Sequence, residues 1–248
     1  MAPFETPQAS PTSDAVLSVT DVDAGYGKKL VLSGVSLYVG RGEAIALLGH
    51  NGAGKTTVLR VVFGLQIAWR GSVAFAGTSV GNGHSAGAAV QLGMAMIPSE
   101  RFVFPDLTVL ENLRLSARGI TSEQRDERLA AAYEDFPILK ARGKQLAGVM
   151  SGGEQRMVSL AMALMRKPSL LLLDEPSLGL SPAIAEQLMA RVRKLIDGGT
   201  SVILVEQNIP AALSVAKRVY VLRSGRIIFE EPAKALAAMP REKWWELF

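Results

Sequence analysis

Gly49-His50-Asn51-Gly52-Ala53-Gly54-Lys55-Thr56 is the stretch of this chain that decides its fold. Glycine, glycine, lysine and threonine stand at every fixed position of the phosphate-binding loop pattern. The flanks agree with this pattern. Residues 44–48 form an apolar run typical of a buried strand, and residues 56–62 have the spacing of a helix. Strand, loop and helix in this order predict a loop that binds the phosphates of a nucleotide.

Three features make such a loop bind anions. Its glycines let backbone N–H groups turn inward, the start of the helix carries partial positive charge, and Lys55 adds a full charge. The hydroxyl of Thr56 is predicted to hold Mg²⁺, and Thr57 follows it in the helix. A glycine-rich turn that fits the pattern by chance is disfavoured, because the strand and the helix are both in place.

The bulk composition narrows the class of protein. A chain of 248 residues is long enough for one large or two small domains, and 48% apolar with 20% charged residues predicts a globular protein. Without cysteine there are no disulfides or thiolate metal sites, and His50 and His84 cannot form a histidine-rich metal site. The net charge of +4 is too small to argue by itself for nucleic acid or an anionic membrane.

Domain boundaries follow from local composition. Residues 1–15 are rich in Pro, Ser and Thr without a basic-then-apolar order, so we expect a disordered tail rather than a signal peptide. Residues 16–248 are predicted to form a single domain, with a helical subdomain at roughly 94–167. No apolar run approaches the ~20 residues that span a bilayer. The aromatic segment 243–248 is either an interaction patch or packed on its own domain.

The expected elements are of two kinds. Residues 16–19, 35–39 and 72–77 have the pattern of short antiparallel strands. Residues 81–86 fit a loose dinucleotide fingerprint, but no strand feeds them and no clear helix follows, so we predict a surface loop. Residues 106–167 read as mostly helical.

The C-terminal part predicts parallel strands and a hairpin. Residues 170–173 and 202–205 are continuous apolar runs, as in strands buried on both faces. Ser181, followed by Pro182, is the expected cap of a helix, and residues 220–229 read as a terminal hairpin. The predicted fold class is therefore α/β.

Two acidic residues follow the first of these apolar strands. Asp174 is placed where a phosphate-loop enzyme holds Mg²⁺ together with the loop threonine. Glu175 is one residue further and points differently, so it can accept a proton from an attacking water as a general base. Paired acids also occur at helix starts, but four preceding leucines and Pro176 favour the catalytic interpretation.

The stretch Met150-Ser151-Gly152-Gly153-Glu154-Gln155 resembles the signature motif of ABC-type ATPases, usually written LSGGQ or LSGGE. Its serine, Ser151, lies 23 residues before Asp174 (174 − 151). The resemblance covers roughly residues 16–235. It implies a phosphate-loop NTPase core with an antiparallel β subdomain and a helical signature subdomain. It also implies ATP as substrate with Mg²⁺, and an adenine-stacking role for Tyr26. In that family Ser151, Gly152, Gly153 and Glu154 would contact ATP on the opposite subunit, so that two chains enclose two nucleotides.

Three further strings indicate a subtype. Residues 102–109, 176–182 and 204–208 resemble ATPase subunits of branched-chain amino-acid uptake systems, and importers of urea or short amides share similar strings. The resemblance implies a second ATPase subunit, identical or different, and two membrane permease subunits. A solute-binding protein would act indirectly, and no nucleic acid is expected. The chain would lie peripherally on the cytoplasmic face of the inner membrane.

The sequence departs from the family pattern at three positions. Gln207 stands where most members have a histidine that contacts the γ-phosphate, and it cannot titrate near neutral pH. Ser99 stands where the family has Gln or Glu near Mg²⁺ or the attacking water, and a shift by one residue would give that role to Glu100. Leu180 replaces an aspartate. A soluble ABC ATPase not dedicated to transport, or a weakly hydrolysing regulatory subunit, therefore stays as the alternative to an importer ATPase.

Overall fold

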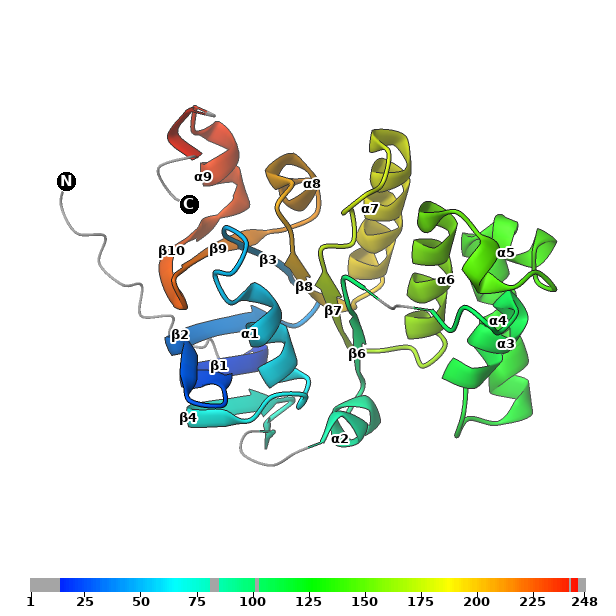
Figure 1. Cartoon of the computed structure of the whole chain (residues 1–248), viewed down its shortest axis with the longest axis horizontal. Helices are drawn as coiled ribbons and strands as arrows, with labels where there is room; N and C mark the ends of the chain where they lie inside the picture. Colours follow the sequence, from blue (N-terminus) through cyan, green and yellow to red (C-terminus); the bar gives the residue numbers. More distant parts are fainter. Residues whose placement is uncertain (1–13, 81–84, 101–102, 241, 245–248) are drawn as a thin grey trace.

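The structure is a computed structural model that describes residues 14–80, 85–100, 103–240 and 242–244. Its strands form two sheets, and helices flank them (Figure 1). The four-stranded antiparallel sheet has the order β2-β1-β4-β5, and its strands are β1 Ala15–Tyr26, β2 Lys29–Gly40, β4 Ala68–Phe75 and β5 Thr78–Ser79.

The six-stranded sheet has the order β10-β9-β3-β8-β7-β6 and is parallel except for the β9–β10 pair. Its strands are β3 Ala44–Leu48, β6 Met94–Ile97, β7 Leu170–Asp174, β8 Ser201–Val205, β9 Arg218–Arg223 and β10 Arg226–Pro232. Because β3, β7, β8 and β9 run in the same direction, their carboxyl ends share one edge of the sheet, where parallel sheets build their sites.

The helices separate into groups (Figure 1). One group is a helical part between β6 and β7, made of α3 Val109–Ser116, α4 Ser122–Asp135, α5 Pro137–Ala141 and α6 Gly152–Leu164. The other helices are α1 Lys55–Val62, α2 Ala86–Gln91, α7 Pro182–Asp197, α8 Ile209–Leu213 and α9 Ala233–Ala238. The two sheets and this helical part confirm the predicted α/β class with an antiparallel β subdomain and a helical subdomain.

The two faces of the parallel sheet bury different partners, because side chains alternate along each strand. In β3, Ile45 and Leu47 join a core shared with the antiparallel sheet and α1. Ala44, Ala46 and Leu48 face the opposite way and join a core shared with α6, α7 and α9. A strand covered on both faces has no polar side, which explains its continuous apolar sequence.

Some predicted elements need correction. A short helix, α2, begins at Ala86 with the Ser85 side chain as its cap, so the expected surface loop does not extend through residue 86, and residues 81–84 lie outside the described part. Residues 94–97 form β6 and pair with β7, so they belong to the sheet rather than to the helical part. Ser181 is at the N-cap position of α7, but its side chain accepts no capping hydrogen bond.

The ends of the chain are described in part. Of the tail expected at 1–15, residues 1–13 lie outside the described part, and β1 begins at Ala15. At the other end, the indole N–H of Trp244 donates to the carbonyl of Leu236 in α9 at 3.0 Å, which favours packing on the same domain. Among the described residues, no helix combines the length and apolar character needed to cross a membrane.

Candidate nucleotide site

The phosphate loop connects β3 to α1, as the sequence predicts (Figure 1). Gly49 has φ 154°, and a Cβ there would lie 2.3 Å from the carbonyl oxygen of Leu222 in β9. Gly54 is the N-cap of α1 with φ 108°, a conformation that other residues rarely adopt. The loop therefore needs glycine at both positions in order to turn tightly from strand to helix.

Lys55 is buried within this loop. Its ammonium group donates to the carbonyls of Gly49 at 2.7 Å and His50 at 3.0 Å, and lies 3.7 Å from the Glu175 carboxylate. Burial lowers the pKa of Lys55, whereas the charges of Glu175 and Asp174 act in the opposite direction. The carbonyl contacts and the carboxylates thus hold a charged amine at the loop.

Thr56 and Asp174 form a second contact between loop and sheet. The Thr56 hydroxyl donates to Asp174 Oδ2 at 2.9 Å, and Asp174 is only 1% exposed. The other carboxylate oxygen, Oδ1, is buried without a hydrogen-bond partner. Burial is the main reason that the pKa of Asp174 is raised, and the Thr56 hydrogen bond opposes this shift.

Thr56 and Asp174 offer oxygen atoms that fit a magnesium ion. Mg²⁺ prefers oxygen ligands and is usually held by one or two protein groups together with substrate phosphates. The residues that the structure describes contain no cluster of three or more His, Asp or Glu side chains suited to a metal. The Thr56 hydroxyl and the Asp174 carboxylate, with its unpartnered Oδ1, are oxygen ligands of the kind that such a shared site uses.

Glu175 lies beside Lys55 and is held by Gln207. Glu175 has φ 48°, and its backbone N–H donates to the carbonyl of Val205 at 2.9 Å. The Gln207 amide nitrogen donates to Glu175 Oε1 and to Asn51 Oδ1, both at 2.7 Å. Three segments far apart in the sequence therefore meet through one amide group.

Glu206 is a site residue that the sequence analysis missed. It directly follows the buried strand β8, as Asp174 ends the neighbouring strand β7, and it is 2% exposed. Its Oε1 accepts the backbone N–H of Ser177 at 2.9 Å, and its Oε2 accepts those of Gln207 at 3.2 Å and Asn208 at 3.3 Å. A charged residue directly after an apolar strand was the available signal.

Ser99 follows β6, and its partner was also missed. Its carbonyl accepts from Arg156 Nη2 at 2.6 Å, and the Pro98 carbonyl accepts from Nη1 at 3.0 Å. Burial lowers the pKa of Arg156, while the carboxylates of Glu206, Asp174 and Glu175 act in the opposite direction. Glu100 is exposed, and residues 101–102 lie outside the described part.

The signature residues form the start of α6. The Ser151 hydroxyl accepts the backbone N–H of Glu154, and Glu154 Oε2 accepts that of Ser151 at 3.0 Å, so the two make a reciprocal cap. A Cβ at Gly153 would lie 2.9 Å from the Ile184 side chain of α7, whereas a Cβ at Gly152 would meet nothing within 4 Å. In Figure 1, α6 lies beyond β6 and β7 from α1.

Tyr26 is the predicted adenine contact. Tyr26 at the end of β1 is 43% exposed, and its hydroxyl accepts from Arg60 at 3.2 Å and lies 3.5 Å from the Thr57 hydroxyl.

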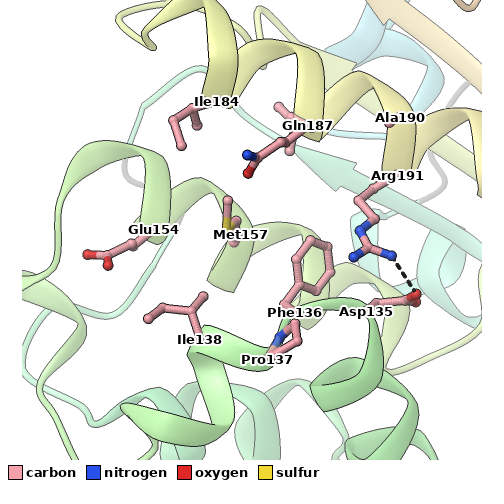
Figure 2. Close-up of a pocket in the computed structure, with 11 residues that line it drawn as sticks. Asp135, Phe136, Pro137, Ile138, Glu154, Met157, Ile184, Gln187, Ala190 and Arg191 are labelled. Atoms are coloured by element: carbon pink, nitrogen blue, oxygen red, sulfur yellow. Dashed lines mark hydrogen bonds and ion pairs between the residues drawn. The ribbon is translucent and has the colours of Figure 1, made fainter.

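A cavity of about 500 Å³ lies between α5, α6 and α7, with Glu154 at one side and Arg191 at the other (Figure 2). This cavity does not include any residue of the phosphate loop.

Comparison with known proteins identifies the family of this chain. Residues 32–178 match the family model described as ABC transporter. The high-affinity branched-chain amino acid transport ATP-binding protein BraG of Pseudomonas aeruginosa is 42% identical over 226 residues, which cover 91% of this chain and 97% of BraG. The probable branched-chain amino acid transport ATP-binding protein LivF of Archaeoglobus fulgidus is 37% identical over 94% of this chain and 98% of LivF.

Solved structures give the same result. An ATP binding subunit of an ABC transporter superposes with a TM-score of 0.81 at 28% identity, covering 94% of this chain and 99% of that one. A dimeric structure of the ATP-binding cassette MJ0796, bound to ADP and Pi after hydrolysis, gives a TM-score of 0.77 at 25% identity. That match covers 88% of this chain and 98% of the cassette.

Proposed function

This chain belongs to the ABC transporter family and is an ATPase, and from that premise we propose that it energises the uptake of branched-chain amino acids. The relatives BraG and LivF, which carry that function in their names, match more than nine-tenths of the chain. A soluble ATPase not dedicated to transport, or a weakly hydrolysing regulatory subunit, is not favoured by these relatives. We propose that residues 16–248 act as one ATPase domain.

The proposed binding site is the phosphate loop with its neighbours. Backbone N–H groups of residues 49–54 and the Lys55 ammonium would bind the phosphates of ATP, with Thr57 behind them and the exposed Tyr26 ring against the adenine. Thr56 and Asp174 would hold Mg²⁺, which supplies positive charge to the phosphate oxygens. The unpartnered Asp174 Oδ1 supports this assignment.

Glu175 is the proposed general base. Its carboxylate lies at the phosphate loop, 3.7 Å from the Lys55 ammonium, where an attacking water must be activated. Gln207 would orient this carboxylate through its 2.7 Å hydrogen bond and would contact the γ-phosphate with the same amide. This contact between Glu175, Lys55 and Gln207 is the observation that carries the proposed hydrolytic role.

The signature residues would complete the site of a second ATPase subunit. The start of α6 lies away from the loop of the same chain, and its N–H groups and the Ser151 hydroxyl suit a phosphate. The related cassette MJ0796 has a dimeric structure. We therefore assign Ser151, Gly152, Gly153 and Glu154 to ATP bound by the partner, whether that subunit is identical or different.

Two membrane permease subunits are the other proposed partners. Three large apolar side chains are exposed, namely Phe104 (50%), Leu146 (45%) and Val149 (66%). They lie on two segments that pair through Thr108 and Leu146. An exposed apolar patch of this kind is typical of an interaction surface. We propose that it faces the permease, and that the chain lies peripherally on the cytoplasmic face of the membrane.

Replacement of Lys55 by alanine tests the central proposal. Lys55→Ala removes the only full positive charge that the loop offers to the phosphates, so ATP binding and hydrolysis should be abolished. Nucleotide titration and phosphate release measure both, with Lys234→Ala in α9 as the control. Unchanged nucleotide affinity in Lys55→Ala would refute the proposed site. Uptake of leucine, compared with urea, by the assembled transporter tests the solute class.

A further inference from the structure

Glu206 joins two loops that the proposed chemistry requires. One carboxylate oxygen accepts the N–H of Ser177, which follows the Asp174-Glu175-Pro176 stretch. The other accepts the N–H groups of Gln207 and Asn208, which follow β8. These three donors are backbone groups, and the Ser177 side chain also hydrogen-bonds the carboxylate, so Glu206 acts mainly on the path of the two loops.

We infer that Glu206 is a positioning residue, which fixes the Gln207 backbone so that the Gln207 amide meets Glu175. This inference rests on the proposed roles of Glu175 and Gln207. The path is short. Glu206 binds the Gln207 N–H at 3.2 Å, and the Gln207 amide donates to Glu175 Oε1 at 2.7 Å. The same amide donates to Asn51 in the phosphate loop, so the nucleotide loop is part of the same chain of contacts.

Stability alone does not account for a carboxylate at this position. Burial is the largest influence on Glu206 and raises its pKa, against the hydrogen bonds of the Ser177 side chain and of the Ser177, Asn208 and Gln207 backbone, which lower it. A net raised pKa means that the charged form is disfavoured in the folded chain, so keeping it charged at neutral pH costs stability. What the charged carboxylate provides is two accepting oxygens that reach both loops at once.

No neutral isostere satisfies the same donors. The side-chain amide of glutamine has one accepting oxygen and one donating NH₂ group. In a Glu206→Gln variant the N–H of one loop would keep an accepting oxygen. The N–H of the other loop would instead face the NH₂ group of the glutamine, which is also a donor. Aspartate keeps the charge but is one methylene shorter, so it reaches only one loop well.

The experiment compares single-turnover ATP hydrolysis by the purified full-length chain. Glu206→Gln should lower the hydrolysis rate by about 10²-fold or less, because displaced groups near the chemistry cost that much. The affinity for ATP should stay within about threefold of wild type, because the hydrogen bonds of Glu206 go to Ser177, Gln207 and Asn208, which lie outside the phosphate loop. Glu206→Asp should fall between the two, and it replaces Glu206→Gln if that variant does not fold.

Glu43→Gln is the matched control. Glu43 is also a largely buried carboxylate that accepts a backbone N–H, that of Gly40 at 2.7 Å, but its partner is Arg218 and it lies outside the nucleotide site. We expect Glu43→Gln to lower the melting temperature and to leave the hydrolysis rate unchanged well below that temperature. A purely structural role for Glu206 would give the same pattern, and that outcome overturns the inference.

A double-mutant cycle with Gln207→Ala identifies the route. Once the amide that meets Glu175 is gone, adding Glu206→Gln should change the rate by less than about threefold. If Glu206→Gln slows the Gln207→Ala variant by its full wild-type factor, Glu206 acts elsewhere and the inference is wrong. If the wild type hydrolyses ATP and Lys55→Ala does not, the proposed function stands whatever the result for Glu206. A wild type without hydrolysis would refute both.

Discussion

At the scale of single residues, the site depends on carboxylates that follow buried strands. Asp174 ends β7 and Glu206 follows β8, its neighbour in the sheet, and both are almost completely buried. Burial raises the pKa of each, so each costs stability at neutral pH. The two carboxylates differ in their partners, because Asp174 presents an unpartnered oxygen whereas Glu206 accepts the backbone N–H groups of Ser177, Gln207 and Asn208.

Sequence reasoning proposed a role for Asp174 but not for Glu206, and the reason is physical. Asp174 belongs to a known pattern of strand, acid and phosphate loop, in which the role is carried by the residue type. The role of Glu206 depends on which backbone N–H groups lie around it. Its position after an apolar strand marks Glu206 as a candidate, but the arrangement of the N–H groups follows from how two loops pack, which residues 201–208 alone do not encode.

Glu175→Gln is the sharpest test of the proposed base. The substitution keeps the size of the side chain, and its carbonyl can still accept from Gln207, but it removes the proton acceptor. Hydrolysis should fall by about 10²-fold or more while ATP binding persists, because general-base catalysis contributes about that factor. Phosphate release and nucleotide titration provide the measurement, with Glu186→Gln on the exposed face of α7 as the control. Turnover at the wild-type rate would place the base elsewhere.

The raised pKa of Glu206 predicts a pH dependence of stability. Because folding raises this pKa above its usual 4.5, the carboxyl holds its proton more tightly when folded. Its stabilising contribution is complete below pH 4.5 and is lost as the pH rises through the folded-state pKa. In Glu206→Gln the free energy of unfolding should therefore fall less steeply with rising pH than in wild type.

Thermal unfolding between pH 4.5 and 8, without nucleotide and with EDTA, measures this slope. Glu186→Gln on the protein surface should follow the wild-type curve. A Glu206→Gln curve as steep as that of wild type would contradict the pH prediction.

At the scale of elements, prediction succeeded where one pattern dominates. The continuous apolar runs of β3, β7 and β8 predicted buried strands because both faces are covered in the structure. It failed where short segments depend on tertiary pairing. Residues 94–97 are a run of only four that becomes β6 by pairing with β7, and α2 is a helix of only six residues.

The start of α6 carries an element-scale prediction. Ser151 caps the helix and lies where the partner's phosphate would approach, so Ser151→Arg places bulk and charge at that contact and removes a cap. ATP-dependent dimerisation, measured by light scattering with the slowly hydrolysing Glu175→Gln background, should be lost. ATP binding to the chain's own loop should persist. Thr121→Arg, which alters the cap of α4 by the same substitution, should dimerise normally.

An ATP-independent dimer that ignores Ser151→Arg would contradict the proposed role of the signature residues. Loss of ATP-dependent assembly in Thr121→Arg would instead mean that a general loss of helix capping is responsible. The two variants therefore separate a phosphate contact from a folding effect.

At the scale of the whole molecule, the proposed site residues fall in two separate parts of the chain. The phosphate loop leads into α1 and the signature forms the start of α6, and these helices lie apart in the fold (Figure 1). The sequence predicted both motifs, but it does not contain the partner that would bring them together. For the same reason it does not identify the solute, because groups that contact the solute would lie in other subunits.

Incomplete half-sites predict slow turnover by the isolated chain. Ser99 is short, and its carbonyl is bound by Arg156, so it offers little to an attacking water. The Gln207 amide is already engaged by Glu175 and Asn51 and cannot titrate near neutral pH. Loss of one water-orienting contact costs ~10²-fold or less, so the basal rate should be low but not absent.

Substitutions at Ser99 and Gln207 test this explanation of the slow basal ATPase rate. Ser99→Gln adds reach towards the water, and Gln207→His adds a ring nitrogen that can exchange a proton, so the double variant should raise the basal ATPase rate several-fold. The wild-type chain assembled with its permease and second ATPase subunit should also exceed the isolated chain. Steady-state phosphate release measures both, with Ser116→Gln on α3 as the control for an added amide. If the isolated wild type already matches the assembled complex, or if the double variant gains nothing, then the partner subunits do not complete this site.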